Sequence, residues 1–233
     1  MVEQSYPVQK EWNAINIPDG TRFEKDHFPL SRNYKAYIDY VLISEGFLRD
    51  RIDRMAQNIY AEYRDKGQLD ILVIMNSAFK FFTDLLSAIN KLSEGDFAKG
   101  DEERLKIRVR YCKITTQHLN LGVVDIEKIH VPVTKEEIIG KNILVVEDIF
   151  DSGSTIIKTR DVLKEYEPGT LKFAILFHKK NLKNLKHNFF GDFVGFIIPD
   201  VFVIGYGMDY NEYYRDLNHL CVINQEGIEH FKQ

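Results

Sequence analysis

The stretch Ile143–Thr155, ILVVEDIFDSGST, decides how the chain folds. Its first four residues form an uninterrupted apolar run, which is typical of a strand buried on both faces of a sheet. Two carboxylates, Glu147 and Asp148, follow directly, and a glycine-containing turn then leads into a helix predicted over 155–166. Ligands of open α/β sheets bind beyond the carboxyl ends of the strands. The stretch therefore places polar chemistry at the edge of a sheet where ligands are expected.

The turn after this strand is built to bind an anion. Small residues around Gly153 leave backbone N–H groups uncrowded at the positive end of the predicted helix, which favours a phosphate. The hydroxyls of Ser152, Ser154 and Thr155 add further donors. The two preceding carboxylates suit sugar hydroxyls or a hydrated Mg²⁺. We therefore expect a phosphate cradle over 151–155 beside a pair of acidic side chains.

Two other interpretations compete for this stretch. Glu147 and Asp148 could merely end a strand, with Asp151 or Ser152 capping a helix. The acidic strand of a nucleotide hydrolase would require a GxxxxGK[ST] loop, and the sequence contains none. It also lacks the GxGxxG fingerprint of dinucleotide-binding domains. On the residues alone, the capping interpretation stays open.

The segments on either side alternate between strand and helix patterns. Helices are predicted over 45–65, which Gly67 ends, and from Phe79 to Ile89. Residues 1–36 are predicted to form an irregular arm, and residues 114–133 a long loop without periodicity. The predicted strands besides 143–146 are 37–43, 71–75, 107–112, 171–177 and 202–206. This alternation predicts an α/β domain with a mainly parallel central sheet flanked by helices.

Composition narrows the functional class. The 233 residues are 44% hydrophobic and carry a net charge of -4, so a general nucleic-acid binder is not expected. Cys112 and Cys221 show no metal-binding spacing and are expected to be free thiols in a reducing compartment. No signal peptide is seen, and no apolar run approaches the roughly 20 residues that span a bilayer. A cytoplasmic protein with no membrane partner is expected.

Two blocks together resemble a known family. VVEDIFDSGST resembles the phosphoribosyl pyrophosphate motif of type I phosphoribosyltransferases. DFVGFIIPDVFVIGYGMDYNEYYRDLNHLCVIN, residues 192–224, is similar to the purine-binding region of the hypoxanthine-guanine phosphoribosyltransferases, and the similarity extends to 37–51 and 79–86. This resemblance implies the type I phosphoribosyltransferase fold with a small hood subdomain. It also implies an arm and part of the hood over 1–36, a core over 37–200, a purine-binding hood segment over 201–233, and a homodimer or homotetramer.

The resemblance also assigns roles to individual residues. Glu147 and Asp148 would bind the ribose hydroxyls, directly or through Mg²⁺, and Asp151 would manage the proton at purine N7. The 5′-phosphate would be bound by Asp151, Ser152, Gly153, Ser154 and Thr155. The purine would be bound by Lys179 (at O6), Phe202 (by stacking), Val203 and Asp209, and Asp209 would also hold a second Mg²⁺. The pyrophosphate would be bound by Arg215 and by the loop Asn76, Ser77 and Ala78.

Several positions depart from the family pattern. Asn76-Ser77-Ala78 replaces the usual Lys-Gly-Gly pyrophosphate loop, and the cis peptide of that loop would fall at Met75–Asn76. Thr116-Gln117 stands where the mobile lid carries a Ser-Tyr pair, and Ser154 replaces a frequent basic residue. These changes cluster on the pyrophosphate side of the expected site.

The resemblance implies a purine salvage enzyme. It would convert hypoxanthine or guanine and phosphoribosyl pyrophosphate into the nucleoside monophosphates IMP or GMP and pyrophosphate. The altered pyrophosphate loop and lid support an alternative, a nucleotide-binding paralogue with little turnover that acts as a sensor or regulator. Use of xanthine is a subordinate alternative.

Overall fold

The structure is a computed structural model that describes residues 14–117, 126–130, 133–182 and 187–232. The strands are β1 (Ile15–Asn16), β2 (Ile38–Ile43), β3 (Gln68–Met75), β4 (Lys106–Gln117), β5 (Ile126–His130), β6 (Asn142–Phe150), β7 (Thr170–Lys179), β8 (Phe193–Ile198), β9 (Val203–Ile204) and β10 (Leu220–Ile223). The α-helices are α1 (Glu45–Tyr63), α2 (Phe79–Glu94), α3 (Lys135–Ile138), α4 (Ser154–Glu165) and α6 (Gln225–His230).

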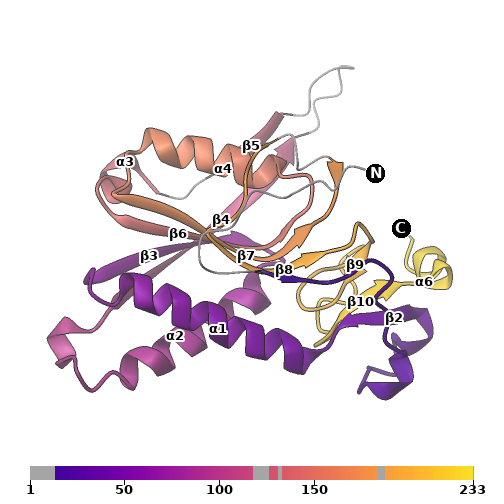
Figure 1. Ribbon diagram of the computed structural model, residues 1–233. Coiled ribbons are helices and arrows are strands. Elements are labelled where there is room, and N and C mark those ends of the chain that lie inside the picture. The colour runs from indigo at the N-terminus through magenta and orange to yellow at the C-terminus, as the bar shows by residue number, and fades with distance from the viewer. Residues whose placement is uncertain (1–13, 118–125, 131–132, 183–186, 233) are drawn as a thin grey trace.

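A seven-stranded sheet forms the centre of the molecule, in the order β1-β8-β7-β6-β3-β4-β5. The first six strands in this order, β1-β8-β7-β6-β3-β4, are parallel to their neighbours, and β5 pairs with β4 in the antiparallel direction. Helices α1 and α2 cover one face of this sheet, and α3 and α4 cover the other (Figure 1). The predicted α/β fold with a mainly parallel sheet is confirmed.

The central strands are buried on both faces, as their apolar runs predicted. In β3, Ile71 and Val73 pack in the cluster that includes α1 and α2, whereas Leu72 and Ile74 pack in the cluster that includes α3 and α4. Successive side chains of a strand point to opposite faces, so one apolar run serves two cores. Each such side chain, fully buried, stabilises the fold by about 1.5–3 kcal/mol. The ends of these strands are therefore held rigidly.

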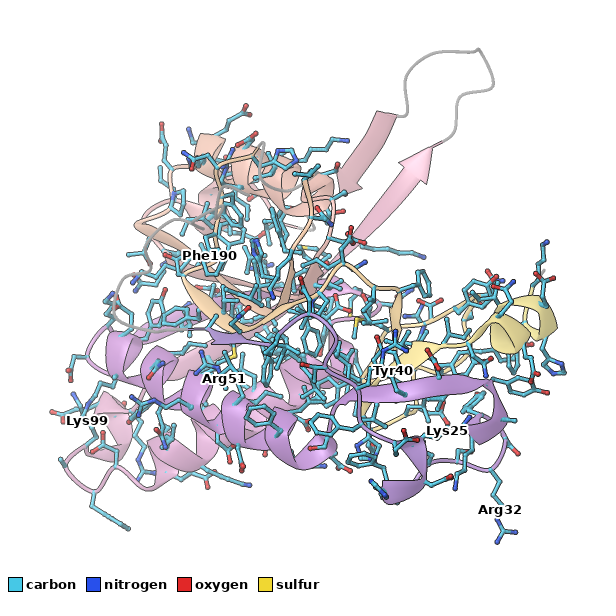
Figure 2. All side chains as sticks on the ribbon, turned by 45° about the vertical axis from the view of Figure 1, so that its right-hand side comes forward. Lys25, Arg32, Tyr40, Arg51, Lys99 and Phe190 are labelled. Carbon is cyan, nitrogen blue, oxygen red and sulfur yellow. The ribbon has the colours of Figure 1, made fainter. Side chains whose placement is uncertain are left out.

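Helices α1 and α2 occur where the spacing predicted them, but their buried stripes differ at the first turn. The helical spacing of apolar residues in the sequence puts Phe47 and Phe79 on the buried faces, but they are 41% and 51% exposed, whereas Leu48 and Phe81 are fully buried. Arg51 of α1 donates to two carbonyl oxygens of β8, those of Val194 (2.8 Å) and Gly195 (2.9 Å). Figure 2 labels this arginine between the helix and the sheet. It fixes α1 against the sheet beyond the contribution of apolar contacts.

A small three-stranded sheet, in the order β2-β10-β9, lies beside the end of the central sheet (Figure 1). Both β2 and β9 pair antiparallel with β10. Buried residues from these strands and the segment before β10 form its own core: Ile38, Val41, Ile204, Tyr214, Leu217, Cys221 and Ile223. Strand β2 comes from the range 37–200 assigned to the core, yet it pairs with β10 from the range 201–233. The proposed division of the chain itself stays a prediction.

The prediction of a long loop over 114–133 is wrong, because most of the described residues in that range belong to strands. Strand β4 continues to Gln117, and β5 pairs with it, with Thr116 opposite Glu127 and Gln117 opposite Ile126. The sequence pattern is weak here because β5 is an edge strand of the central sheet, where pairing with the neighbouring strand outweighs local propensity. Thr116-Gln117, the expected lid pair, thus lies at the end of β4, and residues 118–125 and 131–132 fall outside the described residues.

The strand predicted over 202–206 is shorter than expected and belongs to the small sheet. Only Val203–Ile204 is extended, because Gly205, Tyr206 and Gly207 all have positive φ and turn the chain back. Strands β1, β8 and β10 were not predicted. Of the arm over 1–36, residues 1–13 lie outside the described residues, and Ile15 and Asn16 pair with β8. Within the described ranges, no helix has the length and apolar character needed to cross a bilayer.

Candidate functional site

Two adjoining cavities lie at the carboxyl ends of the central strands. The first, of about 190 Å³, is lined by Ser77, Asp148, Ile149, Asp151, Lys179, Phe202, Val203, Met208 and Asp209. The second, of about 180 Å³, is lined by Glu147, Ile149, Phe150, Asp151, Ser152, Gly153, Thr155 and Ile156. Asp151 and Ile149 line both cavities, so the two cavities share a wall and lie side by side. Most of the residues singled out from the sequence meet there.

The second cavity is the predicted anion cradle at the start of α4. Gly153 is the N-cap residue of this helix and has a φ of 80°, a left-handed conformation that favours glycine. A Cβ atom at this position would lie 2.6 Å from Phe150 Cζ, so a side chain would not fit. The Ser152 hydroxyl lies 3.4 Å from the amide nitrogen of Ser154. The amino-terminal end of α4, with backbone amides that point out of the helix, is suited to a phosphate group.

Lys179 and Asp151 form the polar centre of the first cavity. They are brought together because Phe150 of β6 pairs with His178 of β7, so the next residue of each chain segment emerges side by side. Lys179 Nζ lies 3.1 Å from Asp151 Oδ2 and 3.7 Å from Asp200 Oδ1. Lys179 is buried, whereas about half of the Asp151 side chain is exposed. The pair can present a hydrogen-bond donor and an acceptor to one bound ring.

Glu147 and Asp148 are deeply buried carboxylates. Within the described part of the chain, Glu147 Oε2 and Asp148 Oδ2 accept no hydrogen bond. Burial, and then the neighbouring charge of Asp148, raise the pKa of Glu147 well above its usual range. Burial also raises the pKa of Asp148 to about 6, although the Ser77 hydroxyl opposes this effect. Such perturbed acids in a cleft are typical of a functional site, because a cation or hydroxyl donor would satisfy them.

The turn after β9 brings Asp209 and Arg215 to the same edge. Arg215 Nη2 lies 2.9 Å from Asp209 Oδ1, and Arg215 Nη1 donates to the carbonyl oxygen of Gly207 at 2.9 Å. The backbone of Gly207 packs on that of Ser77, since a Cβ on Gly207 would lie 2.3 Å from the Ser77 carbonyl oxygen. Arg215 is therefore linked to the site by its contacts with Asp209, which lines the first cavity, and with Gly207, which packs against Ser77.

The loop 76–78 and Phe202 complete the site. The peptide bond between Met75 and Asn76 is cis, at the position that the family resemblance implied. Phe202 lines the first cavity, is 52% exposed, and meets the ring of Tyr210 edge-on at a centroid distance of 5.8 Å. About half of this side chain is exposed beside the cavity, where it can contact a bound ligand.

Some predicted residues do not line either cavity, and others were missed. Asn76, Ala78, Ser154 and Arg215 contribute to neither lining. Asn181 was not predicted, yet its side chain donates to Asp151 Oδ1 at 2.8 Å. Its position just after β7 was a usable signal, because the ends of parallel neighbours meet at one edge. Met208 was also missed.

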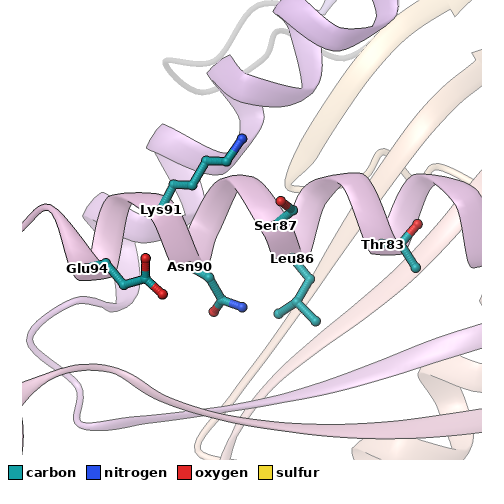
Figure 3. A pocket seen from close by; sticks show the side chains of 6 residues that line it. All are labelled: Thr83, Leu86, Ser87, Asn90, Lys91 and Glu94. Carbon is teal, nitrogen blue, oxygen red and sulfur yellow. The ribbon is translucent and has the colours of Figure 1, made fainter.

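A larger hollow of about 420 Å³ lies along α2, away from this chemistry (Figure 3). It is lined by Thr83, Leu86, Ser87, Asn90, Lys91 and Glu94. These side chains come from a single helix, and none of the residues singled out from the sequence is among them. The size of a hollow therefore does not identify the functional site here.

The sequence of this chain is similar to those of phosphoribosyltransferases. Residues 45–211 match the family described as phosphoribosyl transferase domain. The hypoxanthine-guanine-xanthine phosphoribosyltransferase of Plasmodium falciparum is 34% identical over 96% of this chain and 94% of its own length. The phosphoribosyltransferase domain-containing protein 1 of Xenopus tropicalis is 33% identical over the full length of both chains.

A solved structure agrees with the sequence matches. The hypoxanthine-guanine phosphoribosyltransferase of Schistosoma mansoni in complex with IMP superposes with a TM-score of 0.75 and 31% identity, over 94% of this chain and 99% of that one. Sequence similarity and fold therefore lead to the same group of proteins. This chain belongs to the phosphoribosyltransferase family and is of the hypoxanthine-guanine phosphoribosyltransferase type.

Proposed function

We propose that this chain transfers the ribose 5-phosphate group of phosphoribosyl pyrophosphate to hypoxanthine or guanine, giving IMP or GMP and pyrophosphate. The observation that carries the proposal is the pairing of Lys179 with Asp151, at 3.1 Å, in a cavity also lined by Phe202. A 6-oxopurine offers an acceptor at O6 and a protonated nitrogen at N7. A lysine and a carboxylate side by side match these two groups.

In this proposal the first cavity holds the base. Lys179 donates to O6, Asp151 accepts the N7 proton, and Phe202 stacks on the ring. The backbone of Val203 and of Asp209 faces the 2-position. Lys179 favours hypoxanthine and guanine, because the 6-amino group of adenine would face an ammonium group. Whether xanthine is also accepted depends on the backbone groups at the 2-position.

The second cavity holds the ribose phosphate. The amides and hydroxyls of 151–155 bind the 5′-phosphate, and Glu147 and Asp148 face the ribose hydroxyls. The bond from C1′ to purine N9 forms while the bond from C1′ to the pyrophosphate oxygen breaks, and the N7 proton passes to Asp151. Arg215 binds the pyrophosphate with its fixed donor fork, assisted by the backbone of 76–78.

The donor set also fits Mg²⁺ that arrives with the substrate. The part of the chain described by the structure contains no group of three or more His, Cys, Asp or Glu side chains placed to hold a metal. Mg²⁺ usually keeps several waters and takes one or two carboxylates together with substrate phosphates. Glu147 and Asp148, with their unpartnered oxygens, would hold one ion, and Asp209 a second. The bound ions would neutralise the charge of the leaving pyrophosphate.

The decisive experiment is an assay of nucleotide formation. Each purine is incubated with phosphoribosyl pyrophosphate and Mg²⁺, with and without a chelator, using wild type and Asp151→Asn. Hypoxanthine and guanine should react, the chelator should abolish the reaction, and the variant should lose about 10²–10⁴-fold in kcat, the usual worth of a positioned acid or base. Wild-type kcat in Asp151→Asn would remove Asp151 from the mechanism.

A second function, a nucleotide-binding sensor with little turnover, is favoured by one observation. The loop Asn76-Ser77-Ala78 offers no cation to pyrophosphate. A lost charge-assisted hydrogen bond costs about 1.5–3 kcal/mol, so binding of the donor should suffer more than binding of the nucleotide. If wild type and a variant with Lys-Gly-Gly at 76–78 both bind IMP but neither turns over, the sensor is the correct function. If both turn over, and the variant has the lower KM for phosphoribosyl pyrophosphate, the enzyme is correct.

A further inference from the structure

Asn181 is the contact of Asp151 that the sequence did not predict. Its side-chain amide donates to Asp151 Oδ1 at 2.8 Å and lies 3.2 Å from the Asp151 carbonyl oxygen. The residue is 9% exposed, and its backbone amide donates to the carbonyl oxygen of Lys179 at 3.1 Å. Asn181 therefore holds both the side chain and the main chain of Asp151 from a nearly buried position.

The two oxygens of the Asp151 carboxylate have different partners. Oδ1 is bound by the amide of Asn181, which is short, neutral and fixed at the end of β7. Oδ2 is bound by Lys179, whose long side chain also approaches Asp200 at 3.7 Å. In the proposed function Lys179 moves to the purine O6, so Oδ2 is released at the moment when the N7 proton needs an acceptor. Oδ1 keeps its partner throughout.

We infer that Asn181 is a positioning residue for the N7 proton acceptor, holding the Asp151 carboxylate in place while Oδ2 passes from Lys179 to the purine. The inference rests on the proposed function of Asp151. An amide suits the task because it donates to the carboxylate without competing as a proton acceptor at that oxygen. A hydrogen bond to the ionised form also favours that form, which is the one that accepts the proton.

The test uses two substitutions of Asn181 in the full chain. Asn181→Ala removes the donor and should lower kcat about tenfold to a hundredfold, the range expected for a hydrogen bond to a charged group. The KM for phosphoribosyl pyrophosphate should stay within about twofold of wild type. Asn181→Asp is nearly isosteric and places a negative charge beside Asp151, which disfavours the ionised carboxylate that accepts the proton. The acidic limb of the pH profile of kcat should therefore move to higher pH.

The matched control is Asn142, at the opposite end of the neighbouring strand. Its side chain donates to the Gln68 carbonyl oxygen at 3.1 Å and accepts from Thr170, so it too is a hydrogen-bonded asparagine of the sheet. Asn142→Asp should leave the pH profile unchanged. Far-UV circular dichroism and thermal unfolding show whether each variant folds. An unchanged kcat in Asn181→Ala, or an unmoved profile in folded Asn181→Asp, overturns the inference.

Two further measurements separate this inference from the proposed function. In the double variant Asp151→Asn, Asn181→Ala, kcat should equal that of Asp151→Asn alone, because Asn181 acts through Asp151. If Asp151→Asn is impaired but Asn181→Ala is not, only the inference fails; if Asp151→Asn is unimpaired, both fail. If the wild-type protein shows no turnover, the affinity of each variant for IMP is measured by titration instead. The inference then requires weaker binding by Asn181→Ala and a displaced pH dependence in Asn181→Asp, and equal values refute it.

Discussion

Lys179 is the residue on which the choice of base should depend. Its ammonium group is buried beside Asp151 and faces the cavity that Phe202 lines. Lys179→Gln replaces an obligate donor by an amide that both donates and accepts. We expect kcat/KM for hypoxanthine and guanine to fall by about tenfold to a hundredfold, the worth of a charge-assisted hydrogen bond, while the relative use of adenine rises.

The measurement is kcat/KM for each purine in both proteins. Lys180 provides the control, because its ammonium group binds the carbonyl oxygen of Ile17 at 2.8 Å and turns away from the cavity. Lys180→Gln should keep the wild-type order of purines. Equal use of adenine and guanine by wild type would show that Lys179 does not select the base.

Residues whose chemistry is visible in their type could be predicted from the sequence. Glu147 and Asp148 stand directly after an apolar run, and a carboxylate pair at a strand end is a recognisable signal. Met208 could not be found in this way. It reaches the cavity through a turn in which Tyr206 has a φ of 52°, and no periodicity predicts such a turn. The roles assigned to all these residues stay predictions.

At the scale of elements, the start of α4 depends on a glycine for two separate reasons. Gly153 has a φ of 80°, and a Cβ atom there would lie 2.6 Å from Phe150 Cζ and 2.8 Å from His187 Cδ2. Gly153→Ala should lower the free energy of unfolding by more than the roughly 1–3 kcal/mol that a left-handed non-glycine residue costs. It should also weaken binding of IMP, because the cradle must shift.

A second glycine separates the cost of the left-handed backbone from the cost of the missing space for a side chain. Gly67 has a similar φ of 73°, but no atom lies within 4 Å of the position of its Cβ. Gly67→Ala should therefore show the backbone cost alone and bind IMP as wild type does. Urea unfolding and IMP titration of both variants make the comparison. Equal losses of stability would mean that Phe150 moves aside without cost.

The elements with strong local patterns were predicted, and those that depend on distant partners were not. The run from Ile71 to Met75 is a strand by its own composition. Strand β5 exists through its pairing with β4, and β1 is only two residues long, so neither leaves a clear period in the sequence. Pairing across the chain outweighs local propensity at the edges of sheets.

For the whole molecule, fold class followed from the sequence but the arrangement of strands did not. Alternating apolar runs and amphipathic helices predict a parallel sheet, whatever its order. The order of strands depends on contacts between distant segments, such as the pairing of Ile15 with Phe196 and of β2 with β10. The homodimer or homotetramer, the cytoplasmic location and the three proposed chain divisions all stay predictions.

The response of the whole fold to acid should depend on His178. Its ring is 2% exposed and stacks between Phe150, at 4.8 Å, and Phe190, at 4.6 Å. Burial lowers the pKa of His178 to about 4, from an ordinary value near 6.5. The unfolded chain therefore binds a proton that the folded chain refuses between these pH values. Stability from this residue is complete above about pH 6.5 and is lost as the pH falls toward 4.

The size of the loss follows from the two pKa values. At 1.36 kcal/mol per pKa unit, the free energy of unfolding should fall by about 3 kcal/mol over this range because of His178 alone. Asp148 acts in the opposite direction, because burial raises the pKa of Asp148 to about 6 and its desolvation is relieved when it is protonated. His178→Gln removes the loss of stability that His178 causes on acidification, and it leaves the opposing contribution of Asp148 in place. Urea unfolding should therefore show that the free energy of unfolding falls less between pH 7 and pH 4.5 in His178→Gln than in wild type. His27 is exposed, so His27→Gln should lose as much as wild type. An equal acid loss in all three proteins would assign the response to groups other than His178.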